Sequence, residues 1–452
     1  LKAPVCPADR GRRLRRLRRC AVAAGAAALL AACGGGSGPS PADPNPPAQT
    51  PLACLNLPVE ASWHADTATS SEWNDVRVDT RQRIWRVGYE RGRLGQTSVD
   101  PSGDARAVVQ MLSPEGALLF DSGVRLDSPG ADVAEALTID PTGIVSVAGR
   151  TTGVLAGDGN RGQFDLFVAR FDATAPAATW SMVQTGDVRP QRPRRIAQLD
   201  AGTLVVAGRD DTYVPTNYVA DWSDTTAQSV RIGAGGVLSA GWQHRSGSIE
   251  PDVGEALAVQ AGAVFVGGAV QSGAQRGMFV RKLSSAGEAL WTARYTSAPI
   301  DQVAALVALP DGSLLMAATV SGSFRGGVHR GQQDVVLARI RADDGAVLWS
   351  VQVGTEGSEW LADAKVDAQG RLWLFGETDG SFIQGRAGAG QTDLFLLRLS
   401  AEGVLERAWQ WGTAGHESAS AFSLDRCGRA VAVGYGGDGE RRGALTWFPV
   451  GK

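Results

Sequence analysis

The chain has 452 residues, of which 43% are hydrophobic and 20% are charged, a composition typical of a globular chain and not of a disordered one. Its 58 glycines follow no Gly-X-Y period, which excludes a collagen-like helix and places the excess in turns. The net charge of -3 hides an asymmetry, because residues 1–32 hold 8 basic groups and 1 acidic group, leaving 36 basic and 46 acidic groups, a net of -10, in residues 33–452. Such a body lacks the cations that a general nucleic-acid-binding protein needs.

Residues 1–32 are predicted to be a signal peptide. The arginine-rich run 10–19 precedes an apolar stretch, Ala21–Ala32, in the order found in secretory signals. Twelve residues rise only about 18 Å as a helix, too little for a hydrocarbon core of about 30 Å. We therefore expect export without a permanent membrane span.

The residues that follow add a lipid anchor to this expectation. Leu30-Ala31-Ala32-Cys33 resembles the lipobox of bacterial lipoproteins, and the resemblance implies that Cys33 is lipidated. The alternative is a plain signal peptide in which Cys33 falls after the cleavage site by chance. A thioether diacylglycerol with an N-acyl chain anchors a protein stably, whereas one chain does not. Residues 33–53, rich in Gly, Ser and Pro, are predicted to be a tether.

The resemblance also implies a location. No Asp follows Cys33, which in lipoproteins favours sorting to the outer membrane. We therefore expect an outer-membrane lipoprotein of a Gram-negative bacterium that faces the periplasm or the cell surface, with the membrane as one partner through the lipid.

Two repeating columns organise the rest of the chain, and repeats are the first feature to establish. The first column is a short apolar run that ends in a small residue, and it recurs at 84–88, 145–149, 204–208, 264–268, 314–318, 372–376 and 430–434. The second column is aromatic, and its members are Trp63, Phe120, Trp180, Trp242, Trp291, Trp349 and Trp409. The spacing in both columns shortens at the same repeat, to 50 and 49 residues. The columns therefore belong to one unit of about 58 residues.

Each unit is predicted to contain four short antiparallel strands. A strand such as 132–140 leads into a turn with Gly, and a further strand such as 164–171 follows a polar loop. Four strands with their turns fill a repeat of this length, which is the blade of a β-propeller. The fold class is thus all-β: residues 54–452 form a seven-bladed propeller of four-stranded blades, stacked as one cooperative body.

The ends of the chain are expected to close the ring. The strand of Trp63 has no preceding partner strand in the chain, whereas a single strand, Gly443–Phe448, remains after the last repeat. The simplest account lets this C-terminal strand complete the first blade, which satisfies the exposed edge. Cys54 and Cys427 then lie in neighbouring blades, where a disulfide would stabilise closure by about 3–5 kcal/mol. The alternative is two unpaired thiols.

The pattern resembles the bacterial seven-bladed beta-propeller repeat family, abbreviated SBBP. Its Gln-x-Gly-Thr loop recurs as Gln352–Thr355 and Gln410–Thr413, with a shortened copy at Gln184–Gly186. The resemblance spans roughly residues 55–449 and implies an exported propeller, but it assigns no catalytic residue.

Motifs of known chemistry are missing from the sequence. The four histidines, at positions 64, 244, 329 and 416, share no offset and have no metal-ligand spacing. Neither a nucleophile elbow nor a phosphate loop nor a dinucleotide fingerprint occurs. We therefore predict no metal, no cofactor and no catalytic residue.

One column of acids is the candidate binding site. Eight residues before the end of the first strand of each repeat stand Asp132, Asp252, Asp301, Glu359 and Glu417, with Arg192 in the third repeat. If this strand lies near the axis, the carboxylates ring one mouth of the tunnel and attract a cation or a basic segment. The alternative is that each acid accepts backbone hydrogen bonds and is architectural, as recurrence in most blades favours. Arg192, with Arg189, Arg194 and Arg195, breaks the symmetry and marks either a binding site or a solvated loop.

The tryptophans fall into two groups, one predicted to be buried between blades and one that offers candidates for exposed contacts. Those of the column are predicted to be core between blades, although exposed tryptophans would stack on sugars. Trp73, Trp222, Trp360 and Trp411 lie outside the column and are the better candidates for exposed contacts.

The sequence therefore predicts a lipid-anchored propeller at the cell envelope that acts as a non-catalytic scaffold for a protein or a glycan at the tunnel mouth. The alternative is a propeller enzyme, either a lyase or glycoside hydrolase acting on carbohydrate or a quinone-dependent dehydrogenase, which would need an asymmetric cluster of acid and base groups there.

Overall fold

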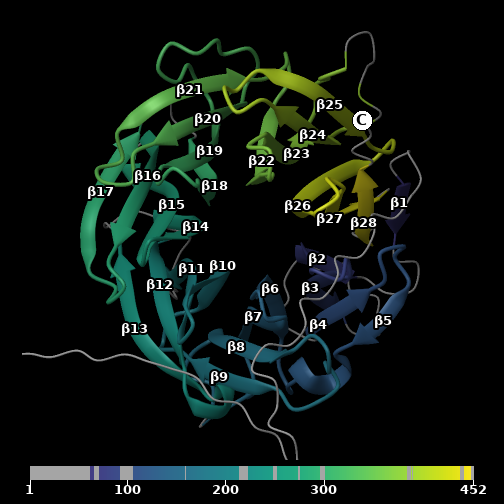
Figure 1. Ribbon diagram of the computed structural model, residues 1–452, viewed down its shortest axis with the longest axis vertical. Coiled ribbons are helices and arrows are strands. Elements are labelled where there is room, and N and C mark those ends of the chain that lie inside the picture. Colours follow the sequence, from purple (N-terminus) through teal and green to yellow (C-terminus); the bar gives the residue numbers. More distant parts are fainter. Residues whose placement is uncertain are drawn as a thin grey trace, which may run out of the picture. The chain divides into compact units, whose positions relative to one another are not determined.

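The structure is a computed structural model, and it describes residues 62–65, 71–91, 105–157, 159–212, 222–247, 252–272, 275–295, 301–383, 388, 390–437 and 442–448. These lie in one compact unit, Pro51–Lys452. Within it the strands form a β-propeller of four-stranded antiparallel blades, arranged around a central axis (Figure 1). The predicted all-β propeller with such blades is confirmed.

The strands pair into seven four-stranded sheets, each built from neighbours in the chain except at the ends. The first three sheets consist of β2 (Ser71–Val78), β3 (Ile84–Arg91), β4 (Ala105–Leu112) and β5 (Leu118–Asp121); β6 (Asp132–Ile139), β7 (Ile144–Thr151), β8 (Asp165–Asp172) and β9 (Ser181–Thr185); and β10 (Gln191–Asp200), β11 (Thr203–Thr212), β12 (Trp222–Ile232) and β13 (Leu238–Ser246).

The next three sheets consist of β14 (Asp252–Gln260), β15 (Ala263–Ser272), β16 (Gln275–Leu283) and β17 (Ala289–Tyr295); β18 (Gln302–Ala308), β19 (Leu314–Val320), β20 (Asp334–Ile340) and β21 (Val347–Val353); and β22 (Glu359–Val366), β23 (Leu372–Thr378), β24 (Asp393–Leu399) and β25 (Leu405–Trp411). Two short 3-10 turns, η1 (Gly123–Leu126) and η2 (Ala234–Gly236), complete the regular elements.

The last sheet joins the two ends of the chain. It consists of β1 (Ser62–Ala65), β28 (Arg442–Phe448), β27 (Ala430–Gly437) and β26 (His416–Leu424), in that order. As predicted, the C-terminal strand pairs with the strand of Trp63, which lies opposite Thr446. The prediction that this strand completes the first blade is wrong, because β2–β5 already form a full sheet. The strand of Trp63 is an outermost strand, so it completes the sheet that precedes β2 around the axis.

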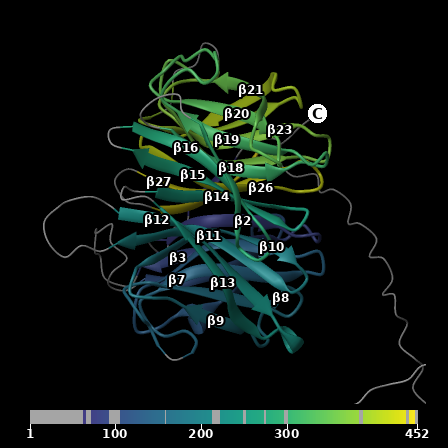
Figure 2. The same ribbon diagram turned by 90° about the vertical axis from the view of Figure 1, so that its left-hand side faces the viewer.

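In Figure 1 the innermost strand of each sheet is its first strand in the chain, except in the last sheet, where it is β26. These inner strands are β2, β6, β10, β14, β18, β22 and β26; each packs on the next, and β26 packs on β2. Seen from the side in Figure 2, the strands of each sheet run side by side. Because every sheet is covered on both faces by its neighbours, the second and third strands read as nearly continuous apolar runs, such as the fully buried β19.

The aromatic column lies on or beside the outermost strands, where its described side chains are half-buried against the core. Trp180 stacks on Phe171 with ring centroids 4.1 Å apart, and Trp409 stacks on Trp373 at 5.8 Å. The column is therefore core, as predicted, and not a sugar-stacking surface. The side chain of Trp63 lies outside what the structure describes.

The Gln-x-Gly-Thr loop has a structural explanation. Gln352 Nε2 donates to the Asp334 carboxylate at 2.8 Å, while its Oε1 accepts from the Phe324 backbone N–H at 3.0 Å. Gln184 and Gln410 make the same pair of bonds in their own sheets. A Cβ at Gly354 would clash with the Asp334 carboxylate, so only Gly fits there. We call this arrangement the amide staple; it fixes the loop before the third strand to the fourth strand.

No helix among the described residues is long and apolar enough to cross a bilayer.

Candidate functional site

The predicted acid column does not ring the tunnel mouth. Its five carboxylic residues lie at the starts of the inner strands and are 0–7% exposed: Asp132, Asp252, Asp301, Glu359 and Glu417. Glu359 accepts from the Thr355 backbone N–H at 3.0 Å and from the Thr355 and Thr378 hydroxyls at 2.5 and 2.8 Å. These bonds hold the loop between two blades.

Equivalent bonds occur in other sheets. Glu417 accepts from Thr413 N–H at 3.0 Å and from its hydroxyl at 2.5 Å, and Asp132 accepts from Ser128 N–H at 2.6 Å. Burial raises the pKa of Asp132 and Glu359, although these hydrogen bonds oppose the rise. The threonine of the Gln-x-Gly-Thr loop therefore serves the acid of the following blade. At Asp132, Glu359 and Glu417 the structure thus agrees with the architectural alternative, in which the acid accepts hydrogen bonds from the loop before its strand.

Arg192 is not the third member of this column. The register shows that Gln191 occupies the equivalent place in β10, where it is buried and accepts from the Leu166 N–H at 3.1 Å. Arg192 is the next residue, so its side chain points to the other face of the strand. It lines a cavity on the axis, together with Arg194 and Arg209.

A repeated irregularity of the inner strands builds this cavity. Each inner strand holds an extra residue relative to its partner strand at the same place in all seven sheets, and β10 holds a second one between Gln198 and Asp200. Such a β-bulge re-aims a side chain and bends the strand. The extra residues at the shared place all line one cavity: Asn74, Glu135, Arg194, Glu255, Ala304, Ala362 and Ser420. We call them the bulge ring.

The bulge ring lies three residues beyond the acid column in each strand. Adding three to Asp132, Asp252 and Glu359 gives Glu135, Glu255 and Ala362, so the sequence held the signal that finds it. The bulge itself was not visible in the sequence, because an extra residue in a strand leaves the apolar pattern nearly unchanged.

Unlike the acid column, the bulge ring is asymmetric. In β2, β6, β10 and β14 its members are polar or charged, whereas β18, β22 and β26 contribute Ala, Ala and Ser. The cavity has a volume of ≈ 350 Å³, and an adjoining cavity of ≈ 330 Å³ shares five of its lining residues. Volumes of this size suit a small ligand or part of a larger one.

The charged wall is built from ion pairs. Arg194 Nε lies 2.6 Å from Glu255 Oε2, and Arg150 Nε lies 2.8 Å from Glu135 Oε1. Burial alone would raise the pKa of Glu255, but the guanidinium groups of Arg194, Arg209 and Arg195 together lower it. Both carboxylates are therefore already paired with an arginine.

A further acid, Glu377 of β23, lines the opposite wall. Burial raises its pKa, although it accepts a hydrogen bond from the Ala419 backbone N–H at 2.8 Å.

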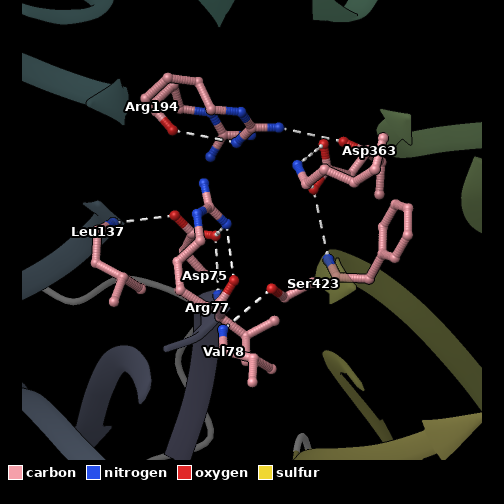
Figure 3. Close-up of polar contacts among 12 residues, drawn as sticks. Asp75, Arg77, Val78, Leu137, Arg194, Asp363 and Ser423 are labelled. Atoms are coloured by element: carbon pink, nitrogen blue, oxygen red, sulfur yellow. Dashed lines mark hydrogen bonds and ion pairs between the residues drawn. The ribbon is translucent and has the colours of Figure 1, made fainter. Parts of the chain in front are cut away.

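A cross-tunnel contact lies next to the cavity (Figure 3). Arg195 of β10 donates from Nη2 to the backbone oxygen of Ala362 in β22 at 3.2 Å, which links the third and sixth sheets. Nearby, Lys365 Nζ donates to Asp363 at 2.6 Å, and Arg77 Nη1 donates to Asp75 at 2.5 Å. Burial alone would raise the pKa of the Asp363 carboxyl. The cations of Lys365, Arg195 and Arg77 together outweigh burial, so its pKa lies below the usual value.

The two carboxylates of this network also join neighbouring inner strands. Asp75 Oδ2 accepts from the Leu137 N–H at 3.0 Å, and Asp363 Oδ2 accepts from the Phe422 N–H at 3.5 Å (Figure 3). Of the arginine cluster noted in the sequence, Arg192, Arg194 and Arg195 therefore lie at the axis on β10, whereas Arg189 lies in the loop before β10 and pairs with Asp224.

The four tryptophans outside the aromatic column do not share one environment. Trp360, next to the bulge residue Ala362, is 38% exposed and lines the cavity, as its place outside the column suggested. Trp73 is 1% exposed and belongs to the core, so the prediction of an exposed contact there is wrong. The side chain of Trp222 lies outside the described part, and Trp411 is half-buried.

The predicted cysteine sites lie mostly outside the described residues. Cys33, the lipidation site, and Cys54 are among them. Cys427 stands in the hairpin turn between β26 and β27 and is disulfide-bonded. Its pairing with Cys54 stays a prediction.

Among the residues that the structure describes, no cluster of three or more His, Cys, Asp or Glu side chains is arranged to hold a metal ion.

Neither a family model nor a curated protein matches this chain. Solved structures resemble it weakly. A catalytically inactive variant of virginiamycin B lyase from Staphylococcus aureus, bound to quinupristin, has a TM-score of 0.45 and 12% identity, over 86% of this chain and 99% of that one. Sqt1 from Chaetomium thermophilum, bound to the N-terminus of a ribosomal protein, has a TM-score of 0.44 and 10% identity, over 84% and 97%.

An α-L-arabinanase from Penicillium chrysogenum, complexed with arabinobiose, has a TM-score of 0.43 and 13% identity, over 69% of this chain and 91% of that one. Likeness at this level carries no ligand or reaction over to this chain.

Proposed function

We propose that this chain is an exported, lipid-anchored member of the SBBP repeat family that acts as a non-catalytic binding scaffold at the outer membrane. In this proposal its seven blades form one closed wheel, and the partner, a protein or a glycan, enters the tunnel at the bulge ring. Cys33 carries the lipid, and residues 33–53 hold the propeller off the membrane surface.

One observation supports the proposal most: the bulge ring breaks the symmetry of the repeat where all inner strands converge. Positions that serve only the architecture, such as the acid column, keep one residue class in most blades. The bulge ring instead carries Asn, Glu, Arg and Glu on one side and small residues on the other. A rigid scaffold with a single asymmetric pocket is how a repeat fold presents a specific site.

The enzyme alternative finds less support in the cavity. Acid–base catalysis needs a carboxylate poised to exchange a proton with the substrate. Glu135 and Glu255 are each paired with an arginine, and Glu377, whose pKa is raised by burial, accepts a hydrogen bond from the Ala419 backbone N–H. A binding role uses such fixed charges directly.

Crosslinking in intact cells followed by mass spectrometry tests the scaffold. The wild-type chain is compared with Ala362→Trp, which fills the cavity, and with Ala289→Trp, a matched change at an exposed place on the outer strand β17. We expect one dominant protein or one class of glycan to be captured by the wild type and by Ala289→Trp but not by Ala362→Trp. Equal capture by all three chains would place the partner elsewhere.

A further inference from the structure

The two adjoining cavities differ in the sign of their lining charge. The cavity of ≈ 330 Å³ is lined by four arginines and three glutamates, whereas the cavity of ≈ 350 Å³ is lined by two arginines and four glutamates. The smaller cavity is therefore net positive and the larger one net negative. The local field favours an anionic group in one cavity and a cationic group in the other, so a ligand that occupies both needs opposite charges at its two ends.

One level of the propeller produces this polarity. Two residues before the bulge ring, each inner strand has a directly opposite partner on the second strand of its sheet. In five sheets both members of this pair line a cavity: Glu72 and Tyr89, Val133 and Arg150, Arg192 and Arg209, Trp360 and Glu377, and Ser418 and Tyr435. At this level the third sheet supplies two cations and the sixth sheet supplies an acid.

The third sheet places two guanidinium groups side by side. Arg192 of β10 stands directly opposite Arg209 of β11, and both line the smaller cavity. Like charges that lie directly opposite on neighbouring strands repel each other. A carboxylate bound between the two arginines relieves this repulsion, and its planar shape suits a guanidinium group.

The sixth sheet places a carboxylate in the larger cavity. Glu377 of β23 is hydrogen-bonded to neutral donors of the described chain, the Ala419 backbone N–H at 2.8 Å and the Ser418 hydroxyl, whereas Glu135 and Glu255 are paired with arginines. Burial accordingly raises the pKa of Glu377. An ammonium group bound at Glu377 supplies a cation to this carboxylate.

Neutral polar side chains complete the lining of the larger cavity. Asn74, Gln302, Ser418 and Ser420 each both donate and accept hydrogen bonds. A peptide backbone presents N–H and C=O groups in alternation, which matches such a lining. A free amino acid does not match, because its ammonium and carboxylate groups are attached to the same carbon, whereas the two charged walls belong to different sheets.

We propose that the two cavities together bind a short peptide, with its carboxylate between Arg192 and Arg209 and its ammonium group at Glu377. This inference deepens the proposed function and rests on it, since it names a peptide as the ligand class of the same site. The third and sixth sheets lie across the axis from each other (Figure 1), and the bond from Arg195 to the Ala362 oxygen spans the tunnel between their inner strands. One small ligand therefore reaches both charged walls.

Isothermal titration calorimetry with three matched probes tests the ligand class. Trialanine carries one charge at each end and no charged side chain, acetyl-trialanine lacks the ammonium group, and trialanine amide lacks the carboxylate. We expect the wild type to bind trialanine about tenfold more tightly than either blocked peptide, the effect of one charge-assisted contact at each end. No binding of trialanine, or a loss of less than about threefold on blocking either end, would overturn the inference.

Two variants assign the two charges to their walls. Arg192→Gln should lose most of its preference for trialanine over the amide while it still discriminates against acetyl-trialanine. Glu377→Gln should do the reverse, and its side-chain carbonyl still accepts from the Ala419 N–H. The matched controls, Arg341→Gln and Glu288→Gln, change exposed residues outside both cavities and should bind all three peptides as the wild type does.

Circular dichroism melts identify any variant that fails to fold, and the comparison of the three peptides on the wild type does not depend on the variants. A folded variant that keeps both wild-type preferences would show that its charge does not bind the peptide, and the inference would fail.

The failures of the two proposals are distinguishable. If trialanine does not bind, or binds no better than its blocked forms, while Ala362→Trp still abolishes capture of the cellular partner, the peptide inference is wrong and the scaffold stands. If Ala362→Trp leaves the capture of the cellular partner unchanged, the tunnel is not the binding site and the scaffold proposal fails first.

Discussion

The sixth and third sheets solve the same structural problem with different chemistry. Around the sixth sheet, neutral amide staples and a buried acid fix the loops, as Gln410 and Glu359 show. In the third sheet Arg245 occupies the place of the staple glutamine, since it lies opposite Thr226 as Gln184 lies opposite Phe167. The third sheet therefore replaces a neutral amide with a cation.

The replacement brings an ionic network with it. Arg245 pairs with Asp187 at 2.7 Å and with the fully buried Asp210, and Arg189 pairs with Asp224 at 2.7 Å. On the inner strand of the same sheet, Gln191 stands where most other blades have an acid, and Arg192, Arg194 and Arg195 turn to the axis. The blades with amide staples and buried acids thus stabilise the propeller, whereas the third sheet supplies the arginines of the cavity.

Replacing Glu359 by alanine should have the largest effect on the regular side. Three donors lose a buried charged acceptor, and we expect a loss of about 3 kcal/mol in the free energy of unfolding. Urea denaturation measures it. Glu359→Gln keeps the shape and one carbonyl acceptor, so its loss should be smaller. A loss below about 1 kcal/mol in the alanine variant would show that the acid column is not architectural.

Replacing Arg245 by glutamine restores the residue of the regular staple but leaves Asp210 buried without its cation. Burial raises the pKa of Asp210 to about 6 from 3.8, although Arg245 opposes the rise. Since the folded pKa lies above the unfolded one, protonation stabilises the fold fully below pH 3.8, and this contribution is lost as pH rises through about 6.

The variant should therefore lose about 2 kcal/mol at pH 8 and clearly less at pH 5, where Asp210 is largely neutral. Unfolding in urea at both pH values measures the difference. Arg341→Gln, an exposed pair with Asp344, is the control and should cost little at either pH. A penalty that does not shrink at pH 5 would mean that Arg245 acts by packing and not by charge.

The repeat columns predicted the propeller, its four-stranded blades and the pairing of its first and last strands, because apolar period and turn residues fix strands locally. They did not predict which sheet the ends complete, since that depends on whether the strand of Trp63 is innermost or outermost. The acid column lies three residues before the positions that line the cavity. Acids that recur at one position of a repeat indicate a shared environment, but they do not indicate which way the side chains face. Only the structure shows that Glu359 faces its own loop while Ala362 faces the axis.

Removing one amide staple should cost less than removing an acid. Gln352→Ala deletes bonds to Asp334, Phe324 and the Gly322 backbone oxygen, all partly buried, and we expect a loss of about 1.5 kcal/mol. Thermal and urea unfolding measure it. Gln369→Ala, in an exposed hairpin turn, is the matched control and should change stability by less than about 0.5 kcal/mol. Equal losses of stability in both variants would show that the amide staple does not stabilise the fold.

The smallest effect on stability is expected at Ala362, on the same strand, β22, as Glu359, where the largest effect is expected. Ala362→Ser lies three residues from Glu359 on β22, but its side chain faces the cavity, and its backbone oxygen still accepts from Arg195. Its stability should change by less than about 0.5 kcal/mol, as for a site without buried partners. Because the hydroxyl enters the tunnel, the same variant should alter ligand affinity while the unfolding curve stays in place. A large loss of stability would mean that the bulge ring, like the acid column, holds the blades together and is not free to vary for binding.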